Sequence, residues 1–260
     1  MKITLIGSGN VATHLGAAFK NAGHHIVQVY SPNVQNAALL AYHIKADPID
    51  DLKHINADTD LFVISVKDDV IDAVAAQLAT HQKPMVHTSG ATPLQVLLKY
   101  SDQVGVFYPL QTFSKTKEVD FWQVPLCIEG AYEDLTTELI QLAQTISNKV
   151  DVVNTYQRKT LHLAAVFACN FPNYLYHAAQ QLLEAHQLDF NLIRPLIAET
   201  AQKVLAQLPA YVQTGPAIRN DGTTMRAHLQ QLGDNEDLKN IYAVLSQAII
   251  KMGEGKHGVK

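Results

Sequence analysis

The sequence predicts an α/β protein in which a doubly wound parallel sheet, residues 1–153, precedes an all-helical domain, residues 154–260. The first observation is that short apolar runs alternate with helical patterns of about ten to fifteen residues through the first half. The second is a glycine-rich turn directly after the first apolar run. The third is a change near residue 153, after which strand patterns disappear and helical patterns lengthen.

Each predicted strand is a short apolar run, and the longest of these runs is continuous enough for a buried parallel strand. The predicted strands are residues 3–6, 25–30, 60–66, 84–88, 103–108 and 125–129. The predicted helices between them, from apolar residues at helical spacing, are residues 11–21, 34–42, 69–80, 92–99 and 132–149. The helices of the second half are residues 155–187, interrupted by Pro172, then 191–207, 223–232 and 236–252, and the tail 253–260 is expected to fray.

The turn after the first strand has the pattern G-x-G-x-x-A, formed by Gly7, Ser8, Gly9, Asn10, Val11 and Ala12. Gly7 permits a tight turn, Gly9 lets backbone approach a pyrophosphate, and Ala12 lets helix and strand pack closely. The helix that follows offers free N–H groups and the positive end of its dipole. The motif therefore predicts a Rossmann domain that binds a dinucleotide through residues 7–12, with a purely structural glycine-rich turn as the alternative.

The end of the second strand indicates which dinucleotide is bound. NAD-selective proteins usually carry a carboxylate there, about 20 residues past the glycines, to hold the ribose 2′-hydroxyl. This chain has Ser31 and Asn33 instead, which could donate hydrogen bonds to a 2′-phosphate. The sequence therefore favours NADP over NAD, although the arginine often used for that phosphate is missing and residues 31–33 could be only a turn.

Polar residues follow three other predicted strands. Ser65, Val66 and Lys67 stand at the end of the central apolar run, Ser89 follows the next strand, and Gln111 follows the one after that. In a doubly wound sheet, ligands bind outside the carboxyl ends of the strands. We therefore expect residues 65–67 beside the cofactor and Ser89 and Gln111 beside the substrate. Ordinary turns that lead into helices are the alternative.

A polar stripe on the first long helix is the candidate catalytic surface. At helical spacing, Lys159, His162 and Asn170 share one face, and an apolar face lies opposite. The stripe lacks acidic residues in its first turns, and Pro172 breaks the hydrogen-bond ladder nearby. We predict His162 as general acid, since imidazole exchanges protons near neutral pH, with Lys159 as the alternate acid and Asn170 orienting substrate. A stripe that merely faces solvent is the alternative.

A turn-rich loop at residues 214–223 supplies the candidate substrate anchor. Arg219 could bind a substrate carboxylate through two hydrogen bonds. Asp221 could take part in the same site or simply cap the helix that starts near residue 223.

Composition excludes several classes of protein. A net charge of −4 in 260 residues gives no basic surface for nucleic acid, and no apolar stretch is long enough for a membrane span. The apolar N-terminus, interrupted by Gly7 and Gly9, predicts a strand rather than a signal peptide. The two cysteines are far apart, which fits a reducing cytoplasm, and none of the 12 histidines has metal-ligand spacing, so no metal is expected.

These segments together resemble the dehydrogenase group that contains pyrroline-5-carboxylate reductase, 6-phosphogluconate dehydrogenase and ketopantoate reductase. The chain is more closely similar to a bacterial family of NADP oxidoreductase-like proteins with a poorly characterised helical C-terminal domain. The segments that carry the resemblance are residues 7–12, 64–69, 87–91, 109–114, 159–170 and 214–221. The resemblance implies hydride transfer between NADP(H) and a carbonyl or imine of a small, anionic substrate, in a homodimer formed through the helical domain.

One departure from the group leaves other functions open. Hydroxyacid-type members carry a Lys and an Asn one turn apart on the first long helix, with the Lys acting on the substrate oxygen. Here Leu163 stands four residues after Lys159. The alternatives are a dinucleotide-binding sensor without turnover and a deazaflavin-dependent NADP reductase.

Overall fold

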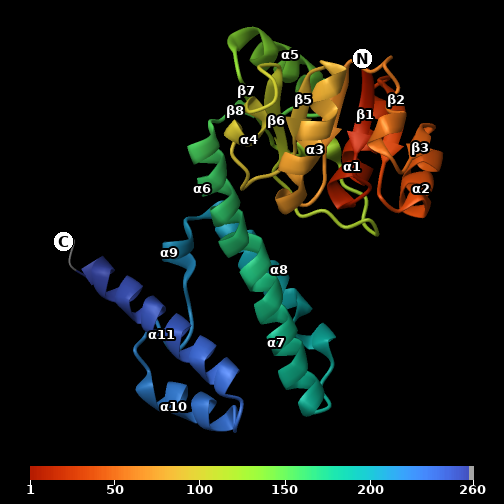
Figure 1. Ribbon diagram of the computed structural model, residues 1–260. Helices are drawn as coiled ribbons and strands as arrows, with labels where there is room; N and C mark the ends of the chain where they lie inside the picture. The colour runs from red at the N-terminus through yellow and green to blue at the C-terminus, as the bar shows by residue number, and fades with distance from the viewer. Residues whose placement is uncertain (258–260) are drawn as a thin grey trace. The chain divides into compact units, whose positions relative to one another are not determined.

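The computed structural model describes residues 1–257 and divides into two compact units, Met1–Phe171 and Pro172–Lys260. We call the first the sheet unit and the second the helical unit. All strands of the described chain lie in the sheet unit, and the helical unit contains only helices and their connections. This arrangement confirms the predicted fold class, a doubly wound α/β sheet followed by helices (Figure 1).

The sheet has eight strands in the order β3-β2-β1-β4-β5-β6-β7-β8. The strands are β1 Lys2–Ile6, β2 His25–Tyr30, β3 Asp47–Ile49, β4 Leu61–Ile64, β5 Met85–His87, β6 Val104–Pro109, β7 Leu126–Gly130 and β8 Val150–Val152. All pairings are parallel except that of β6 with β7. The chain changes its winding direction between β1 and β4, which lie side by side at the centre.

Two strands and one strand direction differ from the prediction. β3 and β8 are three-residue strands at the two edges of the sheet, too short to give an alternating pattern, and β3 contains Pro48, which an edge strand tolerates. The helix predicted over residues 132–149 ends earlier, at Gln144, and β8 begins at Val150, directly after the predicted helix. The sheet was predicted to be parallel throughout, and β7 is antiparallel to β6.

Helices cover both faces of the sheet (Figure 1). The α-helices of this part are α1 Asn10–Asn21, α2 Val34–Ile44, α3 Ile71–Leu78, α4 Gln95–Leu98, α5 Glu133–Gln144 and α6 Thr155–Ala165. Short 3₁₀ turns are η1 Leu52–His54, η2 Asp68–Val70, η3 Ala79–His81 and η4 Phe121–Gln123. Apolar residues of α1, α2 and α5 form one buried cluster with the sheet, and those of α3 and α4 form another.

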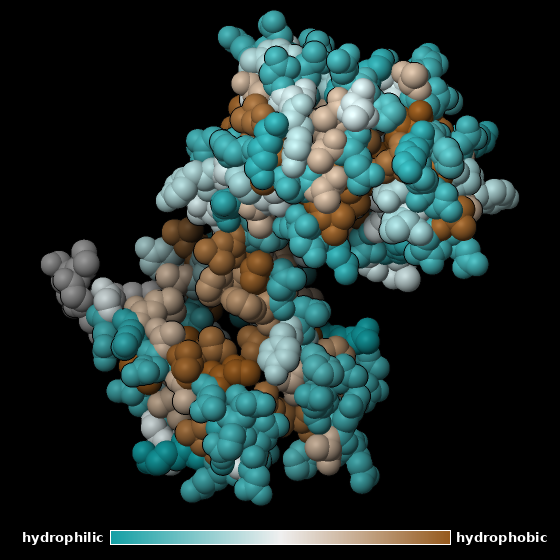
Figure 2. All heavy atoms as spheres, in the orientation of Figure 1, coloured by the Kyte–Doolittle hydropathy of each residue, from teal (hydrophilic) through white to brown (hydrophobic). Residues whose placement is uncertain are grey.

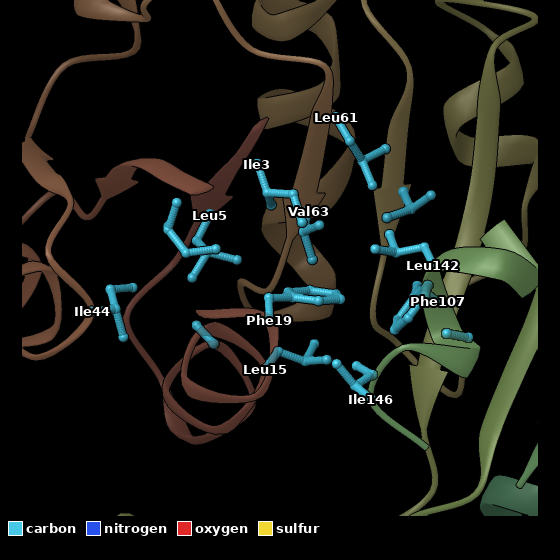
Figure 3. Close-up of a cluster of buried hydrophobic side chains, with 14 of the residues drawn as sticks. Ile3, Leu5, Leu15, Phe19, Ile44, Leu61, Val63, Phe107, Leu142 and Ile146 are labelled. Atoms are coloured by element: carbon cyan, nitrogen blue, oxygen red, sulfur yellow. The ribbon is translucent and has the colours of Figure 1, made fainter. Parts of the chain in front are cut away.

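The larger buried cluster fixes α1 against the centre of the sheet (Figure 3). Phe19 of α1 packs against Phe107 of β6, with ring centroids 5.6 Å apart, and both side chains are fully buried. Each such burial is worth about 1.5–3 kcal/mol. A Cβ on Gly16 would lie 2.7 Å from Leu5 Cδ1, so this glycine lets α1 approach β1 and holds the first turn of the helix at the strand ends.

The long helix after the sheet changes its winding where the sequence predicted an interruption. A π-helical turn, η5 Val166–Asn170, separates α6 from α7 Phe171–Ala185. The N–H of Phe171 bonds to the carbonyl of Val166, five residues back. Pro172 has no N–H and would collide with the carbonyl four residues earlier, so the wider turn before it accommodates the ring.

The remaining helices are η6 Phe190–Leu192, α8 Arg194–Ala206, α9 Pro209–Val212, α10 Gly222–Gln231 and α11 Glu236–His257. The predicted fraying from residue 253 is wrong as far as residue 257, because α11 continues to His257; residues 258–260 lie outside the described part. α9 was not predicted. Figure 2 shows brown, hydrophobic side chains on the visible face of these helices. None of the described helices is long and apolar enough to cross a membrane.

Candidate functional site

The predicted phosphate-binding turn lies where β1 and β4 end side by side. Gly7 has φ +124°, and a Cβ there would stand 2.3 Å from the carbonyl oxygen of Ser65, so only glycine fits. Its N–H donates to the carbonyl of Tyr30 at 2.9 Å, which ties the turn to the end of β2. The turn therefore stands at the point where the sheet reverses its winding, the usual ligand position in this class of sheet.

The space in front of this turn is open. A Cβ on Gly9 would meet no atom within 4 Å. Gly9 is the N-cap of α1 and no side chain caps the helix, so the first N–H groups of α1 point at free space. Ala12 is fully buried in the core, whereas Ser8 and Val11 are half-buried. These features fit the pyrophosphate of a dinucleotide.

Asn10 connects the turn to a second segment. Its side-chain Nδ2 donates to the carbonyl of Phe113 at 2.9 Å, and His14 contacts the carbonyl of Ser114 at 2.9 Å. Phe113 also stacks on His14, with centroids 4.9 Å apart. The loop after β6 is thus held against the first turns of α1. Gln111, at the start of this loop, is exposed, and its Oε1 accepts the N–H of Thr112.

The end of β2 carries no carboxylate, as the sequence indicated. Ser31 is buried, and its hydroxyl accepts the N–H of Asn33 at 3.3 Å. The Oδ1 of Asn33 accepts two N–H groups at the start of α2, so this oxygen caps the helix. The structure adds an acidic residue that the sequence interpretation missed: because Tyr30 pairs with Ile49, Asp50 follows β3 beside Ser31. It was missed because β3 was not predicted.

Ser65, Val66 and Lys67 lie at the end of β4, against the turn. The Ser65 carbonyl faces Gly7, and its hydroxyl accepts from Thr88 at 3.3 Å. Lys67 is exposed and is the N-cap of η2. Residues 65–67 therefore lie at the carboxyl edge of the sheet beside the turn at Gly7, and their contact with a cofactor stays a prediction.

The turn after β5 is held by its own hydrogen bonds. Ser89 Oγ accepts the N–H groups of Ala91 and Thr92, at 3.1 and 2.9 Å. His87 is fully buried, its Nδ1 accepts the N–H of Ser89 at 3.2 Å, and its Nε2 has no partner among the described residues. Burial, followed by the nearby Arg158 charge, lowers the pKa of His87 to about 3, so this ring is neutral. The Ser89 hydroxyl, predicted to bind substrate, holds this turn.

His162 is the one predicted catalytic residue that contacts another candidate group. Its Nδ1 lies 3.2 Å from the hydroxyl oxygen of Tyr108, at the end of β6, and the two rings meet edge to face. A Cβ on Gly90 would lie 2.7 Å from His162 Nδ1 and 2.8 Å from the Tyr108 ring. Burial raises the pKa of Tyr108 to about 12. The glycine therefore allows an imidazole and a protonated phenol to meet at the carboxyl edge of the sheet.

The other residues of the predicted stripe are not in this cluster. Lys159 and Asn170 are both exposed, and no hydrogen bond of either side chain is found within the described part of the chain. Asn170 is the last residue of the π-helical turn η5. A wider turn shifts the helical phase, so the angular positions derived from uniform α-helical spacing do not hold beyond Val166.

The predicted substrate anchors belong to the helical unit. Asp221 is the N-cap of α10 and accepts from Thr224 N and Oγ1, at 3.0 and 2.7 Å. These hydrogen bonds lower the pKa of its carboxyl. Arg219 is exposed, and its role as substrate anchor stays a prediction. Among the side chains that the structure describes, residues 1–255, no group of three or more His, Cys, Asp or Glu could hold a metal ion.

Comparison with known proteins identifies the family. A model described as a Rossmann-like domain matches residues 1–111, and a domain of unknown function, DUF2520, matches residues 124–249. The solved structure of a putative NADP oxidoreductase from Bacteroides fragilis is 41% identical, with a TM-score of 0.92, over 96% of this chain and 98% of that chain. None of the curated proteins searched matches this sequence.

More distant structures share the fold. A Thermotoga maritima protein is 19% identical, with a TM-score of 0.72, over 98% of this chain and 99% of that chain. An imine reductase from Myxococcus stipitatus, in complex with NADP+, is 15% identical, with a TM-score of 0.65, over 100% of this chain and 95% of that chain. The 41% identity over nearly the full length is decisive: this chain belongs to the family of the Bacteroides fragilis protein, in which a Rossmann-like domain is joined to a DUF2520 domain.

Proposed function

We propose that this protein is an NADP(H)-dependent oxidoreductase that transfers hydride between the nicotinamide and a carbonyl or imine carbon of a small, anionic substrate. The observation that carries the proposal is the Tyr108–His162 contact at the same sheet edge as the open turn at Gly9. The 41% identical protein from Bacteroides fragilis, itself described as a putative NADP oxidoreductase, supports the choice of reaction class.

The residues of the chain supply binding and a proton. A bound nicotinamide dinucleotide supplies or accepts the hydride. His162 gives a proton from Nε2 to the substrate heteroatom during reduction, while its Nδ1–H donates to the Tyr108 oxygen. After this transfer the neutral ring keeps its remaining proton on Nδ1, which still donates to the Tyr108 oxygen. Burial keeps the Tyr108 phenol protonated, so its oxygen stays an uncharged acceptor in both states.

Steady-state kinetics with matched variants test this role. Purified protein is assayed for NADPH oxidation with small 2-oxo acids and cyclic imines. We expect His162→Ala to lower kcat by about 10²–10⁴-fold, the usual contribution of a general acid. His43→Ala, an exposed histidine on α2, should leave the rate unchanged. If Lys159→Ala abolishes turnover while His162→Ala does not, Lys159 is the acid and this assignment is wrong.

The cofactor preference rests on the end of β2. No carboxylate there opposes a 2′-phosphate, and the Ser31 hydroxyl and the Asn33 amide nitrogen remain able to donate. Asp50, beside Ser31 on the neighbouring strand, would weaken this preference. Titration of dinucleotide fluorescence should show tighter binding of NADPH than NADH, and Asp50→Asn should increase the ratio. Tighter binding of NADH would overturn the choice of NADP.

One feature favours a second candidate function. Leu163 occupies the position one turn after Lys159 where hydroxyacid-type relatives carry Asn, and Lys159 itself is exposed. A dinucleotide-binding sensor needs neither residue. Tight NADPH binding without turnover over the whole substrate panel would favour the sensor.

We infer further that the protein is a homodimer formed through the helical unit. Large apolar side chains there are exposed in the single chain, among them Leu196 at 65% and Leu205 at 87%. Large apolar side chains exposed in this way are typical of an association surface. Light scattering should report a dimer, and Leu196→Ser with Leu205→Ser should weaken it. Leu39→Ser, on an exposed leucine of α2, is the control. A monomeric wild type at micromolar concentration would exclude the dimer.

A further inference from the structure

The most deeply buried charge of the sheet unit stands one helical turn before His162. Arg158 is fully buried, although a buried guanidinium is costly unless its donors are paired. Burial lowers its pKa, and the Glu129 carboxylate opposes that change. Neither residue belongs to the dinucleotide-binding turn or contacts Tyr108 through a hydrogen bond found in the described chain. Their role therefore needs a separate explanation.

The guanidinium joins three segments that are distant in sequence. Nη1 donates to Glu129 Oε2 on β7 at 2.7 Å. Nε donates to the Ser89 carbonyl at 3.2 Å, and Nη2 donates to the Thr92 carbonyl, both in the turn after β5. The nitrogen atoms are thus directed at two backbone oxygens and one carboxylate. Such a fork geometry is available to arginine and not to lysine.

Glu129 completes the arrangement from the other side. Its Oε1 accepts both the N–H and the hydroxyl of Thr155, each at 2.9 Å, at the first residue of α6. The carboxylate therefore binds the start of α6 and the guanidinium together. We call Arg158, Glu129 and Thr155 the α6 clasp.

The α6 clasp determines where His162 lies. Residues four apart share one face of a helix, so His162 is on the face that Arg158 fixes to the turn. That turn contains Gly90, whose missing side chain leaves room for the His162 ring beside Tyr108. If the turn moved away from α6, the contact of 3.2 Å between His162 Nδ1 and the Tyr108 oxygen would change with it.

We propose that Arg158 and Glu129 are positioning residues that hold His162 of α6 against Gly90 and Tyr108. The catalytic consequence rests on the function proposed above, whereas the geometric consequence does not. Positions on β1, α1 and β4 that surround the phosphate-binding turn make no bond to the clasp in the described chain. Loss of the clasp should therefore affect the chemical step more than dinucleotide binding.

Three variants and one control separate positioning from folding. Arg158→Lys keeps the charge and loses the fork. Arg158→Met with Glu129→Gln removes both charges, so neither partner is left buried and unpaired. Thr155→Val keeps the shape of the side chain but removes the hydroxyl that donates to Glu129 and accepts the N–H of Leu94. Lys99→Met removes an exposed ion pair with Asp72 and is the control.

The first measurement is NMR of histidines labelled at ring carbons, with the His162 signal assigned by its absence in His162→Ala. Tyr108→Phe defines the change that follows loss of the phenol contact. We expect Arg158→Lys to shift the His162 ring-carbon signal in the same direction as Tyr108→Phe, and Lys99→Met to leave that signal unchanged. An unchanged His162 signal in folded Arg158→Lys and Thr155→Val would overturn the proposal, whether or not the protein turns over.

The second measurement is kinetic. Arg158→Lys should lower kcat by up to about 100-fold, the effect of a misplacement of roughly 1 Å, with an unchanged Kd for NADPH. An equal loss of NADPH affinity, or a kcat that stays at the wild-type value, would contradict positioning. If wild type shows no turnover, the proposed function fails and the NMR result alone decides the geometry. If Arg158→Met with Glu129→Gln does not fold, the NMR and kinetic measurements are made on Thr155→Val instead.

Discussion

The sheet unit and the helical unit differ in how much apolar side chain each one buries within a single chain. In the sheet unit, large residues such as Phe19, Phe62 and Phe107 are fully buried. In residues 172–255 of the helical unit, only Ala178 and Ala217 are buried. The sheet unit thus contains its own core, whereas the helical unit has helices with strong apolar faces and little interior.

This difference separates two sources of stability. Burial of side chains within the chain stabilises the sheet unit at any protein concentration. The exposed leucines of α8 can gain the same stabilisation only by association, which depends on protein concentration. The proposed homodimer would supply that association, so the two units should respond differently to equivalent substitutions.

Core truncation should give the largest contrast. Phe107→Ala should lower the free energy of unfolding by about 3–5 kcal/mol, because the fully buried ring leaves a cavity. Leu205→Ala, at 87% exposure, should cost less than about 0.5 kcal/mol when the protein is monomeric. Urea unfolding at low protein concentration measures both. Similar losses for the two variants would show that the helical unit has an interior of its own.

Substitutions of the two glycines in the predicted phosphate-binding turn should have different effects, one on the free energy of unfolding and the other on NADPH affinity. Gly7→Ala should cost about 2–4 kcal/mol, because the new Cβ meets the Ser65 carbonyl at 2.3 Å and φ is positive. Gly9→Ala should leave the unfolding free energy within about 0.5 kcal/mol and weaken NADPH binding, since its Cβ enters open space. Thermal unfolding and fluorescence titration provide the data. Normal NADPH affinity in Gly9→Ala would place the pyrophosphate elsewhere.

The buried His87 should make the sheet unit sensitive to acid. Its pKa is about 3 in the folded protein, so the unfolded chain binds the proton first as pH falls below about 6.5. Stability from the neutral ring is complete above that pH and declines as pH falls toward 3. At pH 5 the loss should be about 2 kcal/mol relative to pH 8. Urea unfolding of wild type and His87→Asn at both pH values should show this difference, and equal pH dependence would rule it out.

The smallest contrast concerns two Tyr–His pairs, one in each unit. His228 Nδ1 lies 2.8 Å from the Tyr242 hydroxyl in the helical unit, and this pair is more exposed than Tyr108 and His162. Tyr108→Phe should cost about 1–1.5 kcal/mol of stability, and Tyr242→Phe about 0.5 kcal/mol. Denaturation midpoints of the two variants test the order. A larger effect at Tyr242 would reverse the contrast.

The sequence predicted those features that depend on short segments. The predicted phosphate-binding turn consists of one strand end, six residues and one helix start, which are adjacent in sequence. The requirement for glycine at position 7 was predicted from the tight turn, and the structure confirms it. The edge strands β3 and β8 were missed because each is three residues long and contains an aspartate, so neither forms the apolar run by which the strands were recognised. Asp50 was missed as a consequence, since its place beside Ser31 comes from the β2–β3 pairing.

The cluster around His162 could be predicted only in part. His162 was identified from the chemistry of its side chain, but Tyr108 is 54 residues away in sequence and Glu129 is 29 residues from Arg158. Arg158 lies one helical turn before His162 on the same face of α6, but the burial of an arginine cannot be recognised from spacing. Asn170 was placed with a uniform helical period that the π-helical turn interrupts.

The reversed direction of β7 determines how the chain returns to the carboxyl edge of the sheet, where the turn at Gly7 lies. β8 runs parallel to β7 and therefore away from the carboxyl edge. The chain reverses at Asn154, the N-cap of α6, and α6 runs back toward the carboxyl edge. Along this path α6 meets Glu129, then Ser89, then Tyr108. Because Glu129 fixes the start of α6, the number of residues along α6 determines where His162 lies. Removal of one residue between Arg158 and His162 would therefore turn the imidazole by about 100° from the phenol while the sheet stays intact.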